Sequence, residues 1–201
     1  MTKNELISSL ITQRVLKTDS LIEAFSKIDR ADFVPYELQN MVYEDRPLPI
    51  GASQTISQPY TVAFMLELLQ PQAQDRVLDF GSGSGWTTAL LASICKHVDA
   101  VERIKSLVVF SKENLLKYSF NNISLHQAGR KLGLPGESFD KILVSCAADE
   151  VPGALIKQLH LGGTMVIPVG HSIFKIRKKS EHDLDIQEYP GFVFVPLVTD
   201  I

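Results

Sequence analysis

Residues 77–86, with the sequence Val77-Leu78-Asp79-Phe80-Gly81-Ser82-Gly83-Ser84-Gly85-Trp86, decide how the rest of the chain is interpreted. The apolar residues before the glycines predict a buried strand, and the three glycines predict a sharp turn before a helix that Trp86 opens. Because glycine has no Cβ, such a turn lets the backbone approach a nucleotide-like ligand closely. The alternating glycines differ from the G-x-G-x-x-G spacing of dinucleotide-binding folds.

An acidic residue lies at the end of this strand and of the next one. Asp79 could bind a cationic or hydroxylic part of a ligand. Glu102 follows about 20 residues further on, where a carboxylate can accept both hydroxyls of a ribose. The alternative is that residues 81–85 form only a tight strand–helix turn and that Glu102 is a solvated strand end.

Strands and helices alternate from residue 61 onward, which predicts an α/β fold with a mostly parallel, Rossmann-like sheet and helices on both faces. The predicted strands are 76–80, 97–101, 123–125, 139–145 and 164–169, and the predicted helices are 61–69, 87–94, 105–117 and 154–159. Residues 173–178 and 192–198 predict two extra C-terminal strands joined by a charged turn.

The N-terminal part has a different pattern. Residues 5–28 predict two short helices separated by a turn at 18–20, and residues 43–59 predict a long loop with three prolines. A chain of 201 residues fits one domain. We expect a helical cap with a loop (1–58), a ligand-binding core (59–170) and the C-terminal strands (171–201).

Composition excludes several classes of protein. A net charge of −3 gives no reason to expect a nucleic-acid partner, and no apolar run approaches the length of a membrane span. Cys95 and Cys146 give no disulfide framework, and the five histidines are scattered without metal-ligand spacing, so we expect no metal. These features favour a cytoplasmic protein.

The glycine turn and its two acids resemble the cofactor site of Rossmann-like S-adenosylmethionine-dependent methyltransferases. The resemblance implies that the methionine portion and the ribose of the cofactor are bound by Asp79, Gly81, Ser82, Gly83, Glu102 and Arg103. A nicotinamide-dependent enzyme remains an alternative, because glycine turns alone do not discriminate between the two cofactors.

Further segments resemble the protein-L-isoaspartate O-methyltransferase family, in the same order over roughly residues 30–198. The matching segments are 30–35 (RADFVP), 43–45 (YED), 47–51 (PLPIG), 54–59 (QTISQP), 139–145 (FDKILVS), 158–159 (QL), 161–163 (LGG), 167–170 (IPVG) and 194–198 (FVPLV). The resemblance implies methylation of isoaspartyl residues in damaged proteins, which initiates their repair, by a monomer that converts S-adenosylmethionine to S-adenosylhomocysteine.

By the same resemblance Ser57 is the active-site serine, which orients the substrate carboxylate, while Thr55 and Ile56 line the cofactor. The alternative is that Thr55 and Ser57 only cap the helix that begins near Pro59.

Three positions depart from the family pattern. Ser53 replaces a glycine, which costs stability if that position needs a positive φ. Gly129 matches a cofactor-binding glycine, but Ala128 stands where an acid usually contacts the adenine, so we expect weaker cofactor binding. Cys146 is expected to be a packing residue. These departures leave two alternatives open: a methyltransferase for another carboxyl acceptor, such as a specific peptide, and a non-catalytic cofactor-binding module.

Overall fold

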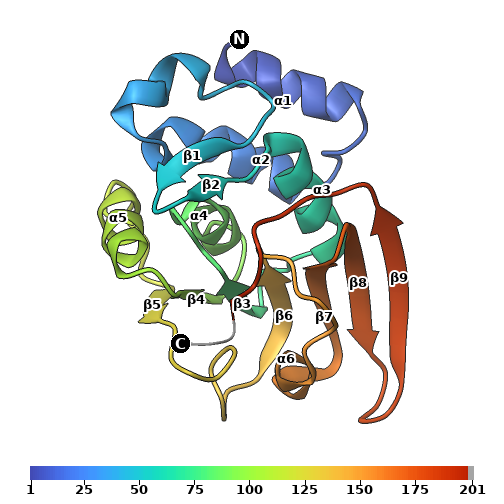
Figure 1. The fold of residues 1–201 in the computed structure, drawn as a ribbon. Coiled ribbons are helices and arrows are strands. Elements are labelled where there is room, and N and C mark those ends of the chain that lie inside the picture. Colours follow the sequence, from blue (N-terminus) through green and yellow to red (C-terminus); the bar gives the residue numbers. More distant parts are fainter. Residues whose placement is uncertain (199–201) are drawn as a thin grey trace.

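A seven-stranded sheet forms the centre of the protein in the computed structural model, which describes residues 1–198 (Figure 1). Its strands are β3 (Arg76–Phe80), β4 (His97–Glu102), β5 (Ile123–Gln127), β6 (Phe139–Val144), β7 (Leu159–Val169), β8 (Ser172–Lys178) and β9 (Leu184–Pro190). They lie in the order β5-β4-β3-β6-β7-β8-β9. The first five strands in this order pair in parallel. β8 pairs with β7 in the antiparallel direction, and β9 pairs with β8 in the same way. The predicted mostly parallel sheet is confirmed.

Helices cover the two faces of the sheet unequally. They are α1 (Lys3–Thr12), α2 (Asp19–Lys27), α3 (Pro59–Leu69), α4 (Trp86–Ala92), α5 (Lys105–Leu115) and α6 (Gly153–Lys157), with the 3-10 helices η1 (Arg30–Phe33) and η2 (Tyr36–Met41). The first five α-helices share one hydrophobic core, whereas α6 packs in a second core on the opposite face. Across residues 1–198, none of the helices has the length and apolar character needed to span a bilayer.

The prediction of a C-terminal strand at 192–198 is wrong. The last strand is β9, which the sequence analysis placed in a charged turn. Because β9 is an edge strand, its side chains are largely solvated and carry charges that mask the strand pattern. Residues 192–198 form a single β-bridge, at Ala147, whose N–H donates to the carbonyl of Val195 at 2.8 Å, and the N–H of Phe192 donates to the carbonyl of His171 at 3.0 Å.

The predicted loop at 43–59 contains a small hairpin between the N-terminal helices and the sheet (Figure 1). Its strands are β1 (Leu48–Gly51) and β2 (Gln54–Ile56). Ala52 and Ser53 form its two-residue turn, with φ values of +49° and +57°. Both values lie in the left-handed region, so the condition under which serine costs stability at position 53 is met.

The hairpin turn yields a prediction about stability. Two consecutive positive φ values characterise the turn that Asn-Gly favours in two-residue hairpins. The double change Ala52→Asn and Ser53→Gly is therefore expected to raise the free energy of unfolding by about 1–2 kcal/mol. Urea unfolding would measure it. Ala52→Val, which places a β-branched residue at the same position, should lower the stability, and a gain in that control would contradict the assigned strain.

Candidate active site

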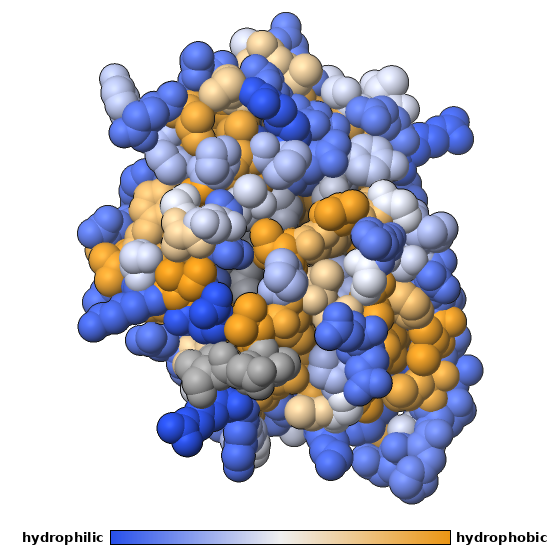
Figure 2. All heavy atoms as spheres, viewed as in Figure 1, coloured by the Kyte–Doolittle hydropathy of each residue, from blue (hydrophilic) through white to orange (hydrophobic). Residues whose placement is uncertain are grey.

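A cavity of about 1110 Å³, counting its open mouth, lies at the carboxyl ends of the parallel strands. Chain order reverses there, because β4 and β6 flank β3 on its two sides, and α/β sheets usually bind ligands at such a switch point. The lining comes from the hairpin (50–57), the glycine turn (80–87) and the segments 101–107, 128–132, 145–146 and 195–198. Figure 2, viewed from the same side as Figure 1, shows hydrophobic side chains gathered across the middle of this face.

The glycine turn follows β3 with positive φ at its three glycines. Gly85 has a φ of +89°, and a Cβ there would lie 2.5 Å from the hydroxyl oxygen of Ser111 on α5, so backbone conformation and packing both favour glycine. Gly83 differs, because it lines the cavity and its N–H donates to the Glu102 carboxylate at 3.0 Å. The turn therefore has both a packing role and a ligand-facing side.

Asp79 lies directly beneath this turn and is completely buried. Its Oδ2 accepts hydrogen bonds from the hydroxyls of Thr87 at 2.9 Å and Thr88 at 2.6 Å, while its Oδ1 has no partner among the described residues. Burial raises the pKa of Asp79 to about 6. A buried carboxylate oxygen without a partner is costly unless a donor from a ligand reaches it. This oxygen lies behind the cavity lining, with its acceptor capacity unused by residues 1–198.

Glu102 is a buried strand end, so the alternative of a solvated one is wrong. Its Oε1 accepts from the N–H of Ile104 at 2.7 Å and its Oε2 from the N–H of Gly83. Two backbone donors hold the carboxylate in one orientation at the cavity wall. Each oxygen keeps a lone pair, which suits the two hydroxyls of a ribose.

On the hairpin side, Ser57 lines the cavity and is half-buried. Neither Thr55 nor Ser57 caps α3, so that alternative is wrong: the N-cap is Gln58, which makes no side-chain cap bond. The N–H of Tyr60 instead donates to the carboxylate of Asp45 at 2.8 Å, a cap from a distant segment. The hydroxyl groups of the hairpin are thereby left for the cavity.

The segment after β5 closes the cavity beyond Glu102. Ala128, Gly129, Arg130 and Lys131 all line it, and Glu102 is the sole carboxylate in the lining formed by residues 1–198. Residues 1–198 contain no group of three or more His, Cys, Asp or Glu side chains that could hold a metal ion.

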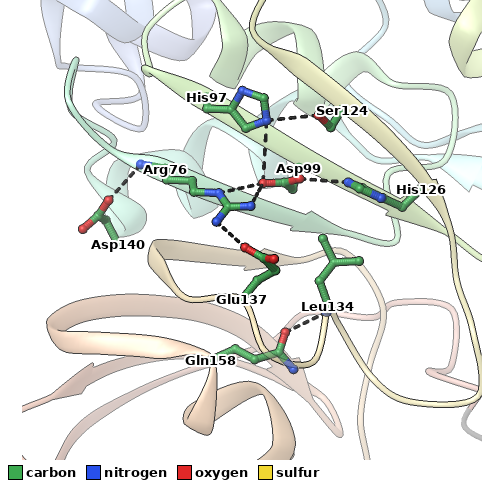
Figure 3. Close-up of polar contacts among 9 residues, drawn as sticks. All are labelled: Arg76, His97, Asp99, Ser124, His126, Leu134, Glu137, Asp140 and Gln158. Carbon is green, nitrogen blue, oxygen red and sulfur yellow. Dashed lines mark hydrogen bonds and ion pairs between the residues drawn. The ribbon is translucent and has the colours of Figure 1, made fainter.

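A polar network away from the cavity fixes the shape of this segment (Figure 3). Arg76 donates to Asp99 and to Glu137, which ends the segment, at 2.9 and 2.6 Å. Gln158 accepts from the N–H of Leu134 at 2.7 Å and donates to the carbonyl of Leu132 at 2.9 Å. The middle of the segment 128–138 is therefore tied to Gln158 at the end of α6, and its last part is tied to Arg76 on β3.

Most residues that the sequence analysis assigned to the site gather in one place. The cavity is lined by Thr55, Ile56, Ser57, Gly81, Ser82, Gly83, Glu102, Arg103 and Gly129, with Asp79 one layer behind them. The analysis missed the role of 195–198 as a wall of the cavity. It quoted Asp45 and Arg30 within family-like segments but assigned them no role, because their hydrogen bonds are to backbone groups.

An open, mostly parallel sheet whose switch point carries a glycine turn and two buried acids defines a Rossmann-like nucleoside-binding protein. The family model for protein-L-isoaspartate(D-aspartate) O-methyltransferase (PCMT) matches residues 1–201. The chain is 42% identical over 207 residues to protein-L-isoaspartate O-methyltransferase of Ignicoccus hospitalis, covering 98% of each chain. With the same enzyme of Petrotoga mobilis it shares 39% identity, covering 96% of this chain and 93% of the relative.

The fold is shared with a solved PCMT of Plasmodium falciparum, crystallised with S-adenosyl-L-homocysteine, at a TM-score of 0.88 and 24% identity, with full coverage of both chains. The chain belongs to the protein-L-isoaspartate O-methyltransferase family. Membership in a methyltransferase family removes the nicotinamide-dependent alternative.

The burial of Asp79 predicts a pH-dependent difference in stability. The pKa of Asp79 is about two units higher in the folded state than in the unfolded state, so the folded state holds the proton more tightly. Ionisation of Asp79 therefore costs up to about 3 kcal/mol of folding stability, and the stability falls as pH rises from 4 through 6. Asp79→Asn removes this cost. Without ligand, the variant should gain stability over the wild type at pH 8 and lose most of that gain at pH 4.

Urea unfolding at several pH values would measure this gap. Asp183→Asn, in the exposed turn between β8 and β9, is the control and should follow the wild type. A gap between Asp79→Asn and the wild type that is the same at every pH would show that the buried charge is not its cause.

Proposed function

We propose that this protein transfers a methyl group from S-adenosylmethionine to the carboxyl group of isoaspartyl residues, which initiates repair of damaged proteins. One observation carries the proposal: a single cavity is lined both by the glycine turn with Glu102 and by the hairpin with Ser57. A cofactor bound at the turn and an acceptor bound at the hairpin would meet in it. Membership in the family supports this choice of reaction.

The residues present fit the cofactor. Glu102 would hold the ribose hydroxyls, and the buried carboxylate of Asp79 behind the turn would favour the positively charged amino group of the methionine portion. The turn around Gly83 allows close approach of the backbone, with Ser82, Arg103 and Gly129 beside it. When bound, the cofactor supplies a methyl group activated by its sulfonium.

The chain itself has little acid–base chemistry to perform. A substrate carboxylate with a pKa near 4 is ionised at neutral pH, so no general base is required. Ser57 would donate a hydrogen bond that orients the carboxylate oxygen toward the methyl carbon. Holding the reacting atoms in line is worth about 7–11 kcal/mol, and the hairpin would also exclude water. The resulting ester is set to cyclise to a succinimide, whose hydrolysis restores some normal aspartate.

Two other functions would use the same cavity. A methyltransferase for a specific acidic peptide would keep Ser57 and differ only in the surface that receives the acceptor. A non-catalytic cofactor-binding module is motivated by Ala128, which cannot accept a hydrogen bond from an adenine amine. Turnover separates these functions, whereas cofactor affinity does not.

The deciding experiment is methyl transfer from labelled S-adenosylmethionine to an isoaspartyl peptide, with the matching aspartyl peptide as control. Transfer confined to the isoaspartyl peptide is expected. No transfer from a preparation that binds S-adenosylhomocysteine in calorimetry would refute the repair function. Transfer only to one ordered peptide would favour the specialised enzyme.

The role of Ser57 makes a separate prediction. Ser57→Ala should lower turnover by about 10- to 100-fold, because one oriented hydrogen bond to a charged acceptor is lost. The affinity for S-adenosylhomocysteine should change by much less. Steady-state kinetics and calorimetry would measure the two effects, and Ser57→Thr, which keeps a hydroxyl, should retain more turnover. An equal fall in turnover and affinity would contradict the assigned role.

A further inference from the structure

The guanidinium of Arg30 lies at the junction between the hairpin and the glycine turn. Arg30 belongs to η1 and is only 2% exposed. Its NH2 donates to the carbonyl oxygens of Ser57 at 3.1 Å and Arg46 at 2.9 Å, and its NH1 donates to those of Val42 at 2.5 Å and Glu44 at 3.4 Å. One side chain therefore joins its own segment, η1, to two others, residues 42–46 and residue 57.

The same guanidinium also contacts the cofactor side of the cavity. Its Cζ lies 5.4 Å from the ring centroid of Trp86, the first residue of α4 after the glycine turn. Trp86 lines the cavity, and Phe25 packs edge-on against the Trp86 ring at 5.6 Å between ring centroids. A cation placed over a tryptophan ring is attracted by the electron-rich ring face, more strongly when water is excluded.

The burial of a cation without a paired carboxylate needs an explanation. Asp45 is the nearby acid, but none of its contacts in residues 1–198 is an ion pair with Arg30; its carboxylate accepts from the N–H of Tyr60. Burial lowers the pKa of Arg30 to about 10, and the group remains charged at neutral pH. A hydrophobic side chain would fill the same volume at lower cost, but it could not hold four carbonyl groups in a fixed arrangement.

We propose that Arg30 is a positioning residue for methyl transfer: its guanidinium fixes the backbone of Ser57 relative to Trp86, and hence the acceptor side of the cavity relative to the cofactor side. Arg30 itself does not line the cavity. Because a displacement of about 1 Å can lower the rate of an aligned transfer about 100-fold, a contact of this kind controls turnover without contributing to binding. The proposal rests on the proposed function, through the role given to Ser57.

Two variants test the proposal. Arg30→Lys keeps the charge but lacks the planar fork that reaches several carbonyls, and Arg30→Gly leaves a space for an added guanidinium ion. Both are expected to lower kcat about 100-fold while the affinity for S-adenosylhomocysteine changes less than about threefold. Methylguanidinium should restore part of the turnover of Arg30→Gly, and none of that of Ser57→Ala.

The matched control is Gln39→Leu. Gln39 lies in η2 and donates to the carbonyls of Ala31 and Val34 at 2.8 and 3.1 Å, so it stabilises the same region without contacting the hairpin. It should lower the melting temperature and leave kcat at 25 °C unchanged. If Gln39→Leu lowered kcat as much as the Arg30 variants at equal loss of stability, Arg30 would have only a structural role.

A readout independent of catalysis separates this proposal from the proposed function. Amide hydrogen exchange at 54–58 in the S-adenosylhomocysteine complex should be about tenfold faster in Arg30→Lys than in the wild type, with exchange in β8 unchanged. Unchanged exchange at 54–58 would overturn the proposal, even if Arg30→Gly failed to fold. If the wild-type protein methylated no isoaspartyl peptide, the proposed function would fail, and the exchange data would still decide whether Arg30 holds the hairpin.

Discussion

The carboxylate of Asp79, buried at the end of β3, is the interaction on which the rest of the site depends. It binds two threonine hydroxyls at the start of α4, so it fixes the direction in which the chain leaves the glycine turn. Glu102 holds the same turn from the neighbouring strand through the N–H of Gly83. Two acids at adjacent strand ends thus clamp one short loop, and Glu102 keeps acceptor capacity on its ligand side.

The site divides between two parts of the chain that have different physical demands. The sheet supplies groups that recognise a cofactor, and strand pairing fixes their positions with little freedom. The hairpin supplies Ser57 from a short antiparallel pair with a strained turn, and such a pair has little stability of its own. Its geometry therefore depends on contacts from outside. The chief ones are the hydrogen bond from Arg30 to Ser57 and the bond by which Asp45, just before the hairpin, accepts from Tyr60 at the start of α3.

The parts of this structure that could be predicted from the sequence are those with a local signature. The glycine turn, its two acids and the alternation of strands and helices follow from glycine spacing and apolar runs, and they were predicted correctly. The hairpin was missed because its turn carries Ala-Ser rather than Asn-Gly, and β9 was missed because an exposed edge strand lacks an apolar face. Arg30 lies in a family-like segment, but its role could not be predicted, because backbone carbonyl groups accept its hydrogen bonds and any sequence provides carbonyls.

The replacement of an acid by Ala128 changes how the far end of the cavity can bind a base, without preventing it. Losing one hydrogen-bond acceptor costs about 1–3 kcal/mol. Burying about 150 Å² of an aromatic ring system at about 25 cal/mol per Å² contributes about 4 kcal/mol. Apolar contact can therefore exceed the lost bond, and Ile104, Leu107 and Leu132 line this cavity. A hydrogen bond to the amine distinguishes adenine from other purines, whereas apolar contact does not. In this chain, we therefore expect contacts of Glu102 and the glycine turn to contribute a larger share of cofactor recognition than contacts with the base.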